Sequence, residues 1–312
     1  MPALYRYRSQ MLVLDSIQAL TRGSAFDPLS LALQLDWMRG LYTGVYVEDG
    51  HVHMIAQIHN IVEQHTAHLT FLTPAKTANT IALPSLLEHL GVKSGEMGAM
   101  NLVGEVEELA PAYQAMRRAG FSTYSWQRIW SFPGTAACPE PASRSTPAES
   151  GSAGTWQRWE STDGIATRNL YSAVVPALLQ PIKPFITRYP HRLVYREKGE
   201  LLAYADLVYG PQGIWIQPMV SPVAEQASCL LVDLLTQLPH RAARTVYICV
   251  RSYQAWLESS LEDLSAEVGP RQALLVKRLA IAQKVTSELP VAALERTQVK
   301  TSSTIARVKR SS

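Results

Sequence analysis

The sequence is poor in cysteine and in long apolar runs. Its three cysteines, Cys138, Cys229 and Cys249, lack the CxxC spacing and leave one over, so we expect neither a disulfide framework nor a cysteine zinc site. No stretch approaches the roughly eighteen apolar residues of a membrane span. The first residues also lack the apolar core of a secretory signal. These absences together predict a cytoplasmic protein that has no membrane partner.

An excess of charge of one sign is also missing. The 29 Lys and Arg residues against 26 Asp and Glu give a formal net charge of +3, and this small excess is dispersed along the chain. Nucleic-acid-binding domains concentrate basic residues on one face, so we expect no nucleic-acid partner. Hydrophobic residues make up 47% of the chain, which is enough for packed cores and excludes global disorder.

Changes in composition divide the chain into two units. Residues 133–154 contain Pro, Ser, Gly and Ala but no larger aliphatic side chain, which predicts a flexible linker. Residues 285–312 are polar and basic and predict a disordered tail. The ranges 1–132 and 155–284 that remain are each long enough to form a domain with its own core.

The first unit alternates short β-rich runs with helical stretches. The Asp49-Gly50 pair between two such runs is typical of a tight hairpin turn. A helix is predicted to begin at Asp27-Pro28, where Asp27 caps it and Pro28 takes the first position. The other predicted helices are 83–90 and 110–119, and the predicted strands are 10–14, 43–47, 52–58, 67–72, 101–106 and 121–132.

The second unit repeats this order. Helices are predicted over 164–179, with a break at Pro176, and over 224–238 and 254–267, and strands over 192–196, 201–209, 214–220, 245–250 and 272–279. Each unit has a helix, antiparallel strands that end in Ser/Thr-Pro, then helix, strand, helix and strand. The pattern predicts an α/β fold (an α+β mixed sheet) with helices on both faces, duplicated within the chain.

Several segments carry a resemblance to a known family. They are AHLTFLTP and QAMRRAGF in the first unit, and GIWIQPMVSP, AEQASCLLVDLL and RTVYICVRSYQAWLESSLEDL in the second. In order and spacing they resemble two tandem domains of the GNAT superfamily of acyl-CoA-dependent N-acetyltransferases. The resemblance implies acetyl-CoA or another acyl-CoA as co-substrate, and direct transfer to an amine. In such a unit the fourth and fifth strands splay apart, and the pantetheine lies between them.

The sequence departs from the family at the cofactor loop. Glycines normally open the helix after the fourth strand, where the helix N-terminus receives the pyrophosphate, but the matching residues 75–82 and 223–228 contain none. The second loop also places the acidic Glu225 at the phosphate position, so we expect any acyl-CoA to bind the first unit weakly. The cofactor contacts implied there are Leu72, Thr73, Lys76, Thr77, Asn79 and Thr80. The competing hypothesis is a catalytically inactive GNAT-fold binding or scaffold protein.

The catalytic candidates follow from the same resemblance. Glu105, on a strand beside the implied gap, is the candidate general base, with a solvent-facing strand residue as the structural alternative. Family members place a tyrosine acid where this sequence has Met116, so Tyr113 is the substitute candidate, and a core tyrosine is its alternative. His51, His53, His59 and His68 are interpreted as sheet residues, and we expect no metal. No motif marks the acceptor amine or the oligomeric state.

Overall fold

The computed structural model describes residues 10–23, 40–76, 82–134, 154–187, 189–224, 227–239, 244–279 and 306–308. The first half contains β1 (Leu12–Val13), α2 (Ser16–Arg22), β2 (Leu41–Glu48), β3 (His51–Ile61), η2 (Val62–Gln64), β4 (Thr66–Thr73), α4 (Ala82–Glu96), β5 (Asn101–Glu107), α5 (Pro111–Arg118) and β6 (Ser122–Phe132). The helix predicted from Asp27, residues 135–153 of the predicted linker and most of the predicted tail lie outside the described residues.

The second half repeats the arrangement of the first. It contains β7 (Thr155–Arg158), η4 (Ser161–Asp163), α6 (Gly164–Val174), β8 (Arg192–Glu197), β9 (Glu200–Tyr209), β10 (Gly213–Val220), α7 (Ala227–Gln237), β11 (Thr245–Arg251), η6 (Ser252–Gln254), α8 (Leu257–Asp263), β12 (Glu267–Val268), β13 (Gln272–Arg278) and β14 (Ala306–Val308). Among the described residues, every helix is too short or too polar to traverse a bilayer.

All these strands belong to one mixed sheet. Its order is β14-β2-β3-β4-β5-β13-β6-β11-β10-β9-β8-β7, with β1 beside β4 and β12 beside β6. In the first half β2, β3 and β4 are antiparallel and β5 runs parallel to β4. In the second half β8, β9 and β10 are antiparallel and β11 runs parallel to β10. The mixed sheet and the repeated topology agree with the fold predicted from the sequence.

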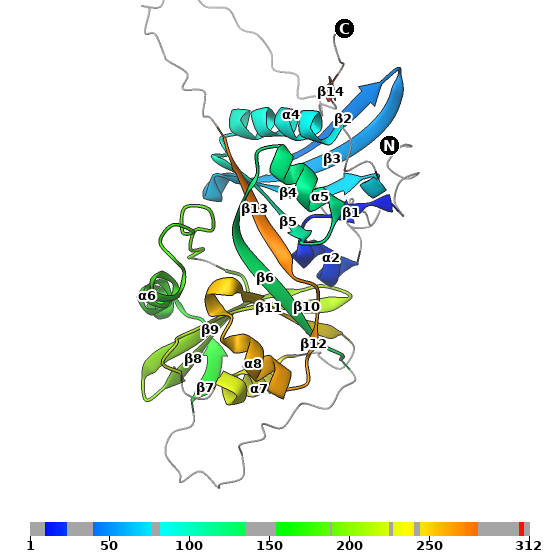
Figure 1. The fold of residues 1–312 in the computed structure, drawn as a ribbon. Coiled ribbons are helices and arrows are strands. Elements are labelled where there is room, and N and C mark those ends of the chain that lie inside the picture. Colours follow the sequence, from blue (N-terminus) through cyan, green and yellow to red (C-terminus); the bar gives the residue numbers. More distant parts are fainter. Residues whose placement is uncertain are drawn as a thin grey trace, which may run out of the picture.

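The two halves exchange strands at the centre of this sheet. Strand β13, which comes from the end of the second half, lies between β5 and β6 and is antiparallel to both. Strand β6 in turn pairs with β11 of the second half, and Figure 1 shows β6 and β13 side by side through the middle of the molecule. The ranges 1–132 and 155–284 are therefore not two self-contained sheets, a feature that the element order did not reveal.

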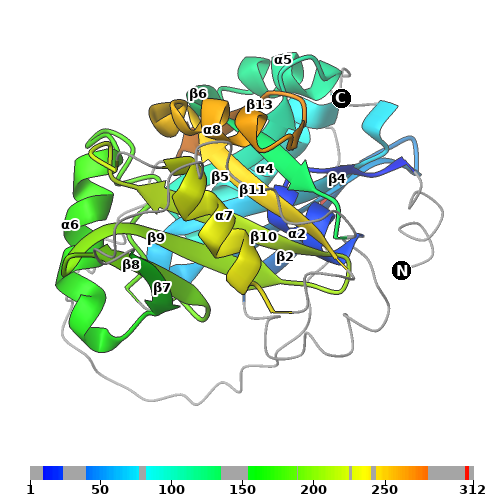
Figure 2. The ribbon, with the colours of Figure 1, turned by 90° about the horizontal axis from the view of Figure 1, so that it is seen from below.

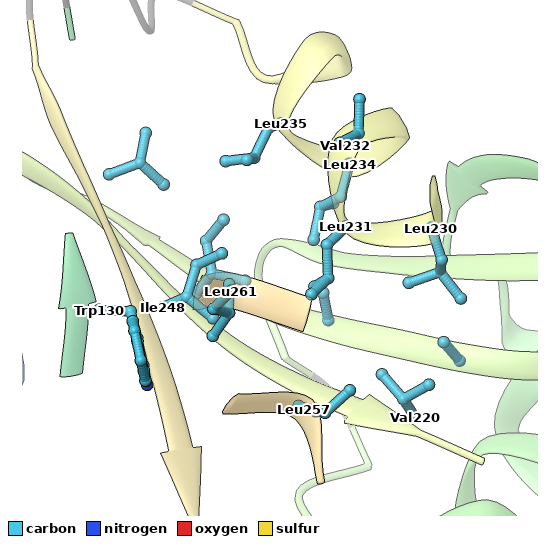
Figure 3. Close-up of a cluster of buried hydrophobic side chains, with 14 of the residues drawn as sticks. Trp130, Val220, Leu230, Leu231, Val232, Leu234, Leu235, Ile248, Leu257 and Leu261 are labelled. Carbon is cyan, nitrogen blue, oxygen red and sulfur yellow. The ribbon is translucent and has the colours of Figure 1, made fainter. Parts of the chain in front are cut away.

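Tight turns and buried cores fix this arrangement locally. Asp49-Gly50 and Lys198-Gly199 close the β2–β3 and β8–β9 hairpins, and all four residues have positive φ, as a two-residue hairpin turn of the I′ type requires. Trp126 and Trp130 are four apart on β6 and therefore share a face of the sheet. Trp126 borders the core beneath α4 and α5, and Trp130 belongs to the core beneath α7 and α8. These four helices thus cover one face, and Figure 3 shows Trp130 at the edge of the cluster that the α7 leucines, Leu257 and Leu261 form.

The opposite face is covered by α6 and α2. Helix α6 packs on β9 and β10 through a separate cluster that includes Tyr171 and Tyr204. Helix α2 belongs to the first half but packs on the second, where Ile17 and Leu20 contact a cluster around Trp215. Figure 2 shows α2 against β10 and α6 set apart beside β8 and β9. Helix α2 was not predicted from the sequence, although its Asp15 N-cap and its C-terminal Gly23 are ordinary end signals.

Candidate functional site

The parallel strands of the first half separate after a short paired stretch. β4 and β5 are in register from Thr66 opposite Asn101 to His68 opposite Val103. Beyond that point β1 pairs with β4 instead, with Leu12 opposite Leu72 and Val13 opposite Phe71. The gap that the family resemblance implied is therefore present, and the chain's own residues 12–14 lie along its β4 side.

Leu14 connects both walls of this gap. Its N–H donates to the Thr70 carbonyl at 2.9 Å, and its carbonyl accepts the Glu105 N–H at 3.0 Å. The Leu14 side chain is only 1% exposed and belongs to the first core. Because main-chain bonds run from β4 through Leu14 to β5, the segment occupies the gap as an additional strand would.

Glu105 holds the continuation of this segment. One carboxylate oxygen, Oε2, accepts the Ser16 N–H at 3.1 Å and the Gln127 side-chain amide at 3.1 Å. Burial by itself raises the pKa of this carboxyl, but Arg251 and the Ser16 hydrogen bonds outweigh burial and bring the pKa below its ordinary value. The carboxylate is therefore charged at neutral pH and anchors the start of α2.

The second half has a corresponding gap, which side chains close. β10 and β11 are in register from Gly213 opposite Thr245 to Ile216 opposite Ile248. Beyond this paired stretch, the side-chain oxygen of Gln254 accepts the Val220 N–H at 2.9 Å, and the side-chain nitrogen of Gln254 donates to the Pro218 carbonyl at 3.0 Å. A primary amide thus forms two bonds with the edge of β10, as a peptide group of a neighbouring strand would.

A row of polar side chains crosses the face of the sheet that α2 covers. Seven neighbouring strands contribute one residue each: Arg192, Asp206, Gln217, Arg251, Gln127, Gln272 and Glu105. Arg251 Nε donates to Gln217 Oε1 at 3.3 Å, and its Nη2 lies 3.9 Å from Glu105 Oε1. Gln127 Nε2 also donates to Gln272 Oε1 at 2.6 Å. The row therefore links the gap of the first half to the gap of the second.

Three further ionisable groups interact electrostatically with this row. Burial, assisted by the Glu105 charge, raises the pKa of Asp15 to about 6. Burial, assisted by Arg251, lowers the pKa of the Lys183 ammonium, and burial lowers the pKa of His68 to about 3 with a smaller effect of Lys183. Displaced pKa values gathered in one place are typical of functional sites and also of buried ion networks. A carboxyl that titrates near pH 6 is suited to accept a proton at neutral pH.

The structure separates the two predicted catalytic residues. Tyr113 lies on α5, where its ring packs 6.0 Å from Trp126 and its hydroxyl is 3.2 Å from the Thr123 hydroxyl. Glu105 bonds to Ser16 on the other face of the sheet. Met116, on the same helix as Tyr113, is fully buried. Glu105 and Tyr113 therefore lie on opposite faces of the sheet, and the role predicted for each stays a prediction.

The predicted cofactor contacts are only partly described. Leu72 is buried opposite Leu12, the Thr73 hydroxyl donates to the Gln10 carbonyl at 3.4 Å, and Lys76 is exposed. Thr77, Asn79 and Thr80 lie outside the described residues. Within the described ranges, no group of three or more His, Cys, Asp or Glu side chains is arranged to hold a metal ion.

Sequence reasoning missed most of the residues that make this site. Gln217, Gln254 and Lys183 carry no motif that distinguishes them from ordinary polar residues. Asp15 was detectable as the cap of a helix, but its proximity to Glu105 depends on the path of the segment through the gap. Arg251 was detectable only as a charged residue at the end of an apolar strand, where pairing with a buried partner is expected.

Comparison with solved structures identifies the class of fold. A GCN5-related N-acetyltransferase from Sphaerobacter thermophilus superposes with a TM-score of 0.52 and 14% identity, over 80% of this chain and 85% of its own. The tandem GNAT protein from the clavulanic acid biosynthesis pathway gives a TM-score of 0.52 and 12% identity, over 84% and 91%. Neither the sequence models of known families nor the curated protein sequences give a match.

The protein thus has the GNAT fold of these acetyltransferases. More particularly, it has a tandem arrangement like that of the clavulanic acid pathway protein, with two copies of the unit in one chain.

Proposed function

We propose that this protein is an acyl-CoA-dependent N-acyltransferase whose co-substrate enters the second half, between β10 and β11. The observation that supports this choice is the difference between the two gaps. Main-chain atoms of residues 12–14 fill the first gap, and side-chain amides close the second. The resemblance implies that pantetheine lies in such a gap. The gap that needs less free energy to open is therefore the better candidate site for the acyl-CoA.

The costs of opening the two gaps differ in kind. Freeing the first requires the loss of the main-chain bonds of Leu14 and the exposure of its side chain, which alone is worth about 1.5–3 kcal/mol. Freeing the second requires rotation of Gln254, and the amides of pantetheine can replace its two bonds to Val220 and Pro218. This reverses the expectation from the helix starts, where Lys76 favoured the first half and Glu225 disfavoured the second.

A catalytically inactive binding protein is the second candidate. One observation favours it: gap-facing groups of both β4 and β10 already have partners, namely Leu14 for Thr70 and Gln254 for Val220 and Pro218. The missing loop glycines point the same way, because a side chain hinders the close approach of backbone to phosphate.

Calorimetric titration of acetyl-CoA into the full chain tests the proposal. We expect saturable binding that Glu225→Gln tightens about fivefold, since it removes a like charge worth on the order of 1 kcal/mol near phosphate. Lys76→Gln serves as the matched control in the first half and should leave the affinity unchanged. If Lys76→Gln weakens binding and Glu225→Gln has no effect, the co-substrate is in the first half. If the wild type does not bind at all, the inactive alternative holds.

A further inference from the structure

A cavity lies at the outer edge of the second half, away from both strand gaps. Its volume is about 450 Å³, and it is lined by Arg158, Trp159, Ser161, Tyr189, Pro190 and Arg192. These residues come from the end of β7, the following η4 turn and the entry to β8. The main-chain N–H of Trp159 donates to the main-chain carbonyl of Arg192 at 3.0 Å, and this bond fixes the two chain segments against each other.

Arg192 is rigidly held in the wall of this cavity. Its Nε and Nη2 donate to the two carboxylate oxygens of Asp206 at 2.6 and 2.9 Å. The guanidinium carbon lies 4.9 Å from the ring centroid of Phe185 and 4.8 Å from that of Tyr204. The residue is 3% exposed. A guanidinium fixed by a bidentate ion pair and by aromatic faces presents its remaining nitrogen in one direction.

Two donors at this cavity lack a partner. Arg192 Nη1 and Trp159 Nε1 are both buried, and neither forms a hydrogen bond with any group in the described part of the chain. A buried donor without a partner costs about 1–3 kcal/mol, so native proteins rarely retain such donors without a reason. Both groups only donate, so what satisfies them must offer acceptor atoms.

The charge around the cavity indicates which acceptor it takes. The Arg192 charge is balanced by Asp206, but the exposed Arg158 forms no ion pair among the described residues. The neighbouring Glu160 carboxylate is used in a capping box with Asp163. Arg158 therefore supplies an unpaired positive charge in the lining of the cavity, and the faces of Trp159 and Tyr189 beside Pro190 offer an apolar wall.

We propose that this cavity binds a small carboxylate with an aromatic or apolar body. One carboxylate oxygen accepts from Arg192 Nη1 and the other from Trp159 Nε1, and the body of the ligand lies against the Trp159 and Tyr189 rings. This site is independent of the proposed acyl-CoA gap, because it shares no residue with β10, β11 or Gln254.

Calorimetric titration of benzoate into the full chain tests this site. We expect saturable binding at millimolar benzoate, which Trp159→Phe weakens at least tenfold because an aromatic ring remains while the indole N–H donor is lost. Arg158→Gln should weaken binding a few-fold, and added salt should weaken it as well. The matched control is Trp156→Phe, because the Trp156 indole N–H already donates to the Leu230 carbonyl at 3.0 Å and its loss should leave benzoate binding unchanged.

A neutral probe separates recognition of charge from recognition of shape. Benzyl alcohol has the same ring but no carboxylate, and we expect it not to bind measurably. The proposal is overturned if benzoate does not bind the wild type, if Trp159→Phe binds benzoate as well as the wild type does, or if benzyl alcohol binds equally well. Acetyl-CoA titration of the same variants should be unaffected, so failure here is distinguishable from failure of the proposed function.

Discussion

The Glu105 carboxylate accepts the main-chain N–H of Ser16 at 3.1 Å, across 89 positions of the sequence. This bond fastens the beginning of the chain to the middle of the sheet. It does so at the place where the GNAT resemblance puts a ligand, since the preceding Leu14 lies between β4 and β5. The residue predicted as a general base is thus also the anchor of the segment that fills the gap.

Replacement of this anchor is predicted to loosen the segment. Glu105→Gln removes the charge that accepts two hydrogen bonds, and we expect a loss of about 1–3 kcal/mol in the free energy of unfolding. Urea denaturation measures the loss, and hydrogen exchange at residues 12–16 should accelerate. The matched control is Glu107→Gln at the exposed end of the same strand, which should change stability by less than about 0.5 kcal/mol. Equal effects of the two substitutions would show that Glu105 is not an anchor.

The fold was predictable from the sequence because its signals are local. The Asp49-Gly50 turn, the Ser221-Pro222 strand end and the leucine pattern of α7 each depend on nearby residues. The exchange of β13 was not predictable, because an apolar strand of seven residues fits either half equally well. The residues that close the gaps were missed for a related reason, since Gln254 and Leu14 gain their roles only through distant partners.

Acidification is predicted to destabilise the protein through His68. Burial lowers the pKa of this imidazole from 6.5 to about 3, so the unfolded chain binds a proton between these values and the folded chain does not. Stability is therefore fully present above about pH 6.5 and falls as the pH drops toward 3, by on the order of 2 kcal/mol between about pH 7 and pH 5. His68→Gln should flatten this dependence in denaturation curves measured across the range.

Asp15 affects the pH dependence of stability in the direction opposite to His68. Its pKa is raised to about 6, so its contribution is fully present below about pH 4 and is lost as the pH rises through 6. Asp15→Asn should remove the stability that Asp15 adds as the pH falls. The free energy of unfolding of this variant should therefore decrease more steeply on acidification than that of the wild type. His53→Gln, at an exposed position on β3, is the control and should leave the pH profile as it is. An unchanged profile in His68→Gln would refute the assignment.

The exchanged strand is predicted to couple the stability of both halves. Leu275 on β13 is fully buried in the core of the first half, so Leu275→Ala should cost about 2–5 kcal/mol. The unfolding should remain a single calorimetric transition, because β13 and β6 connect the two cores. Val268→Ala is the control, since Val268 on β12 is 54% exposed and the change should cost less than about 0.5 kcal/mol. Separate transitions for the two halves would contradict the coupling.

The same exchange predicts that neither half folds alone. Residues 1–134 without β13 would leave β5 and β6 with unpaired edges in the middle of the sheet, and exposed edges of this kind promote aggregation. Residues 154–312 would carry β13 with no partner and would lose β6 from the edge of β11. We expect each half to be insoluble or unfolded when expressed by itself, as judged by circular dichroism. Co-expression of the two halves should yield a soluble complex with the far-ultraviolet spectrum of the intact chain. Two halves that fold separately and show sharp thermal transitions would mean that β6 and β13 do not complete each other's sheets.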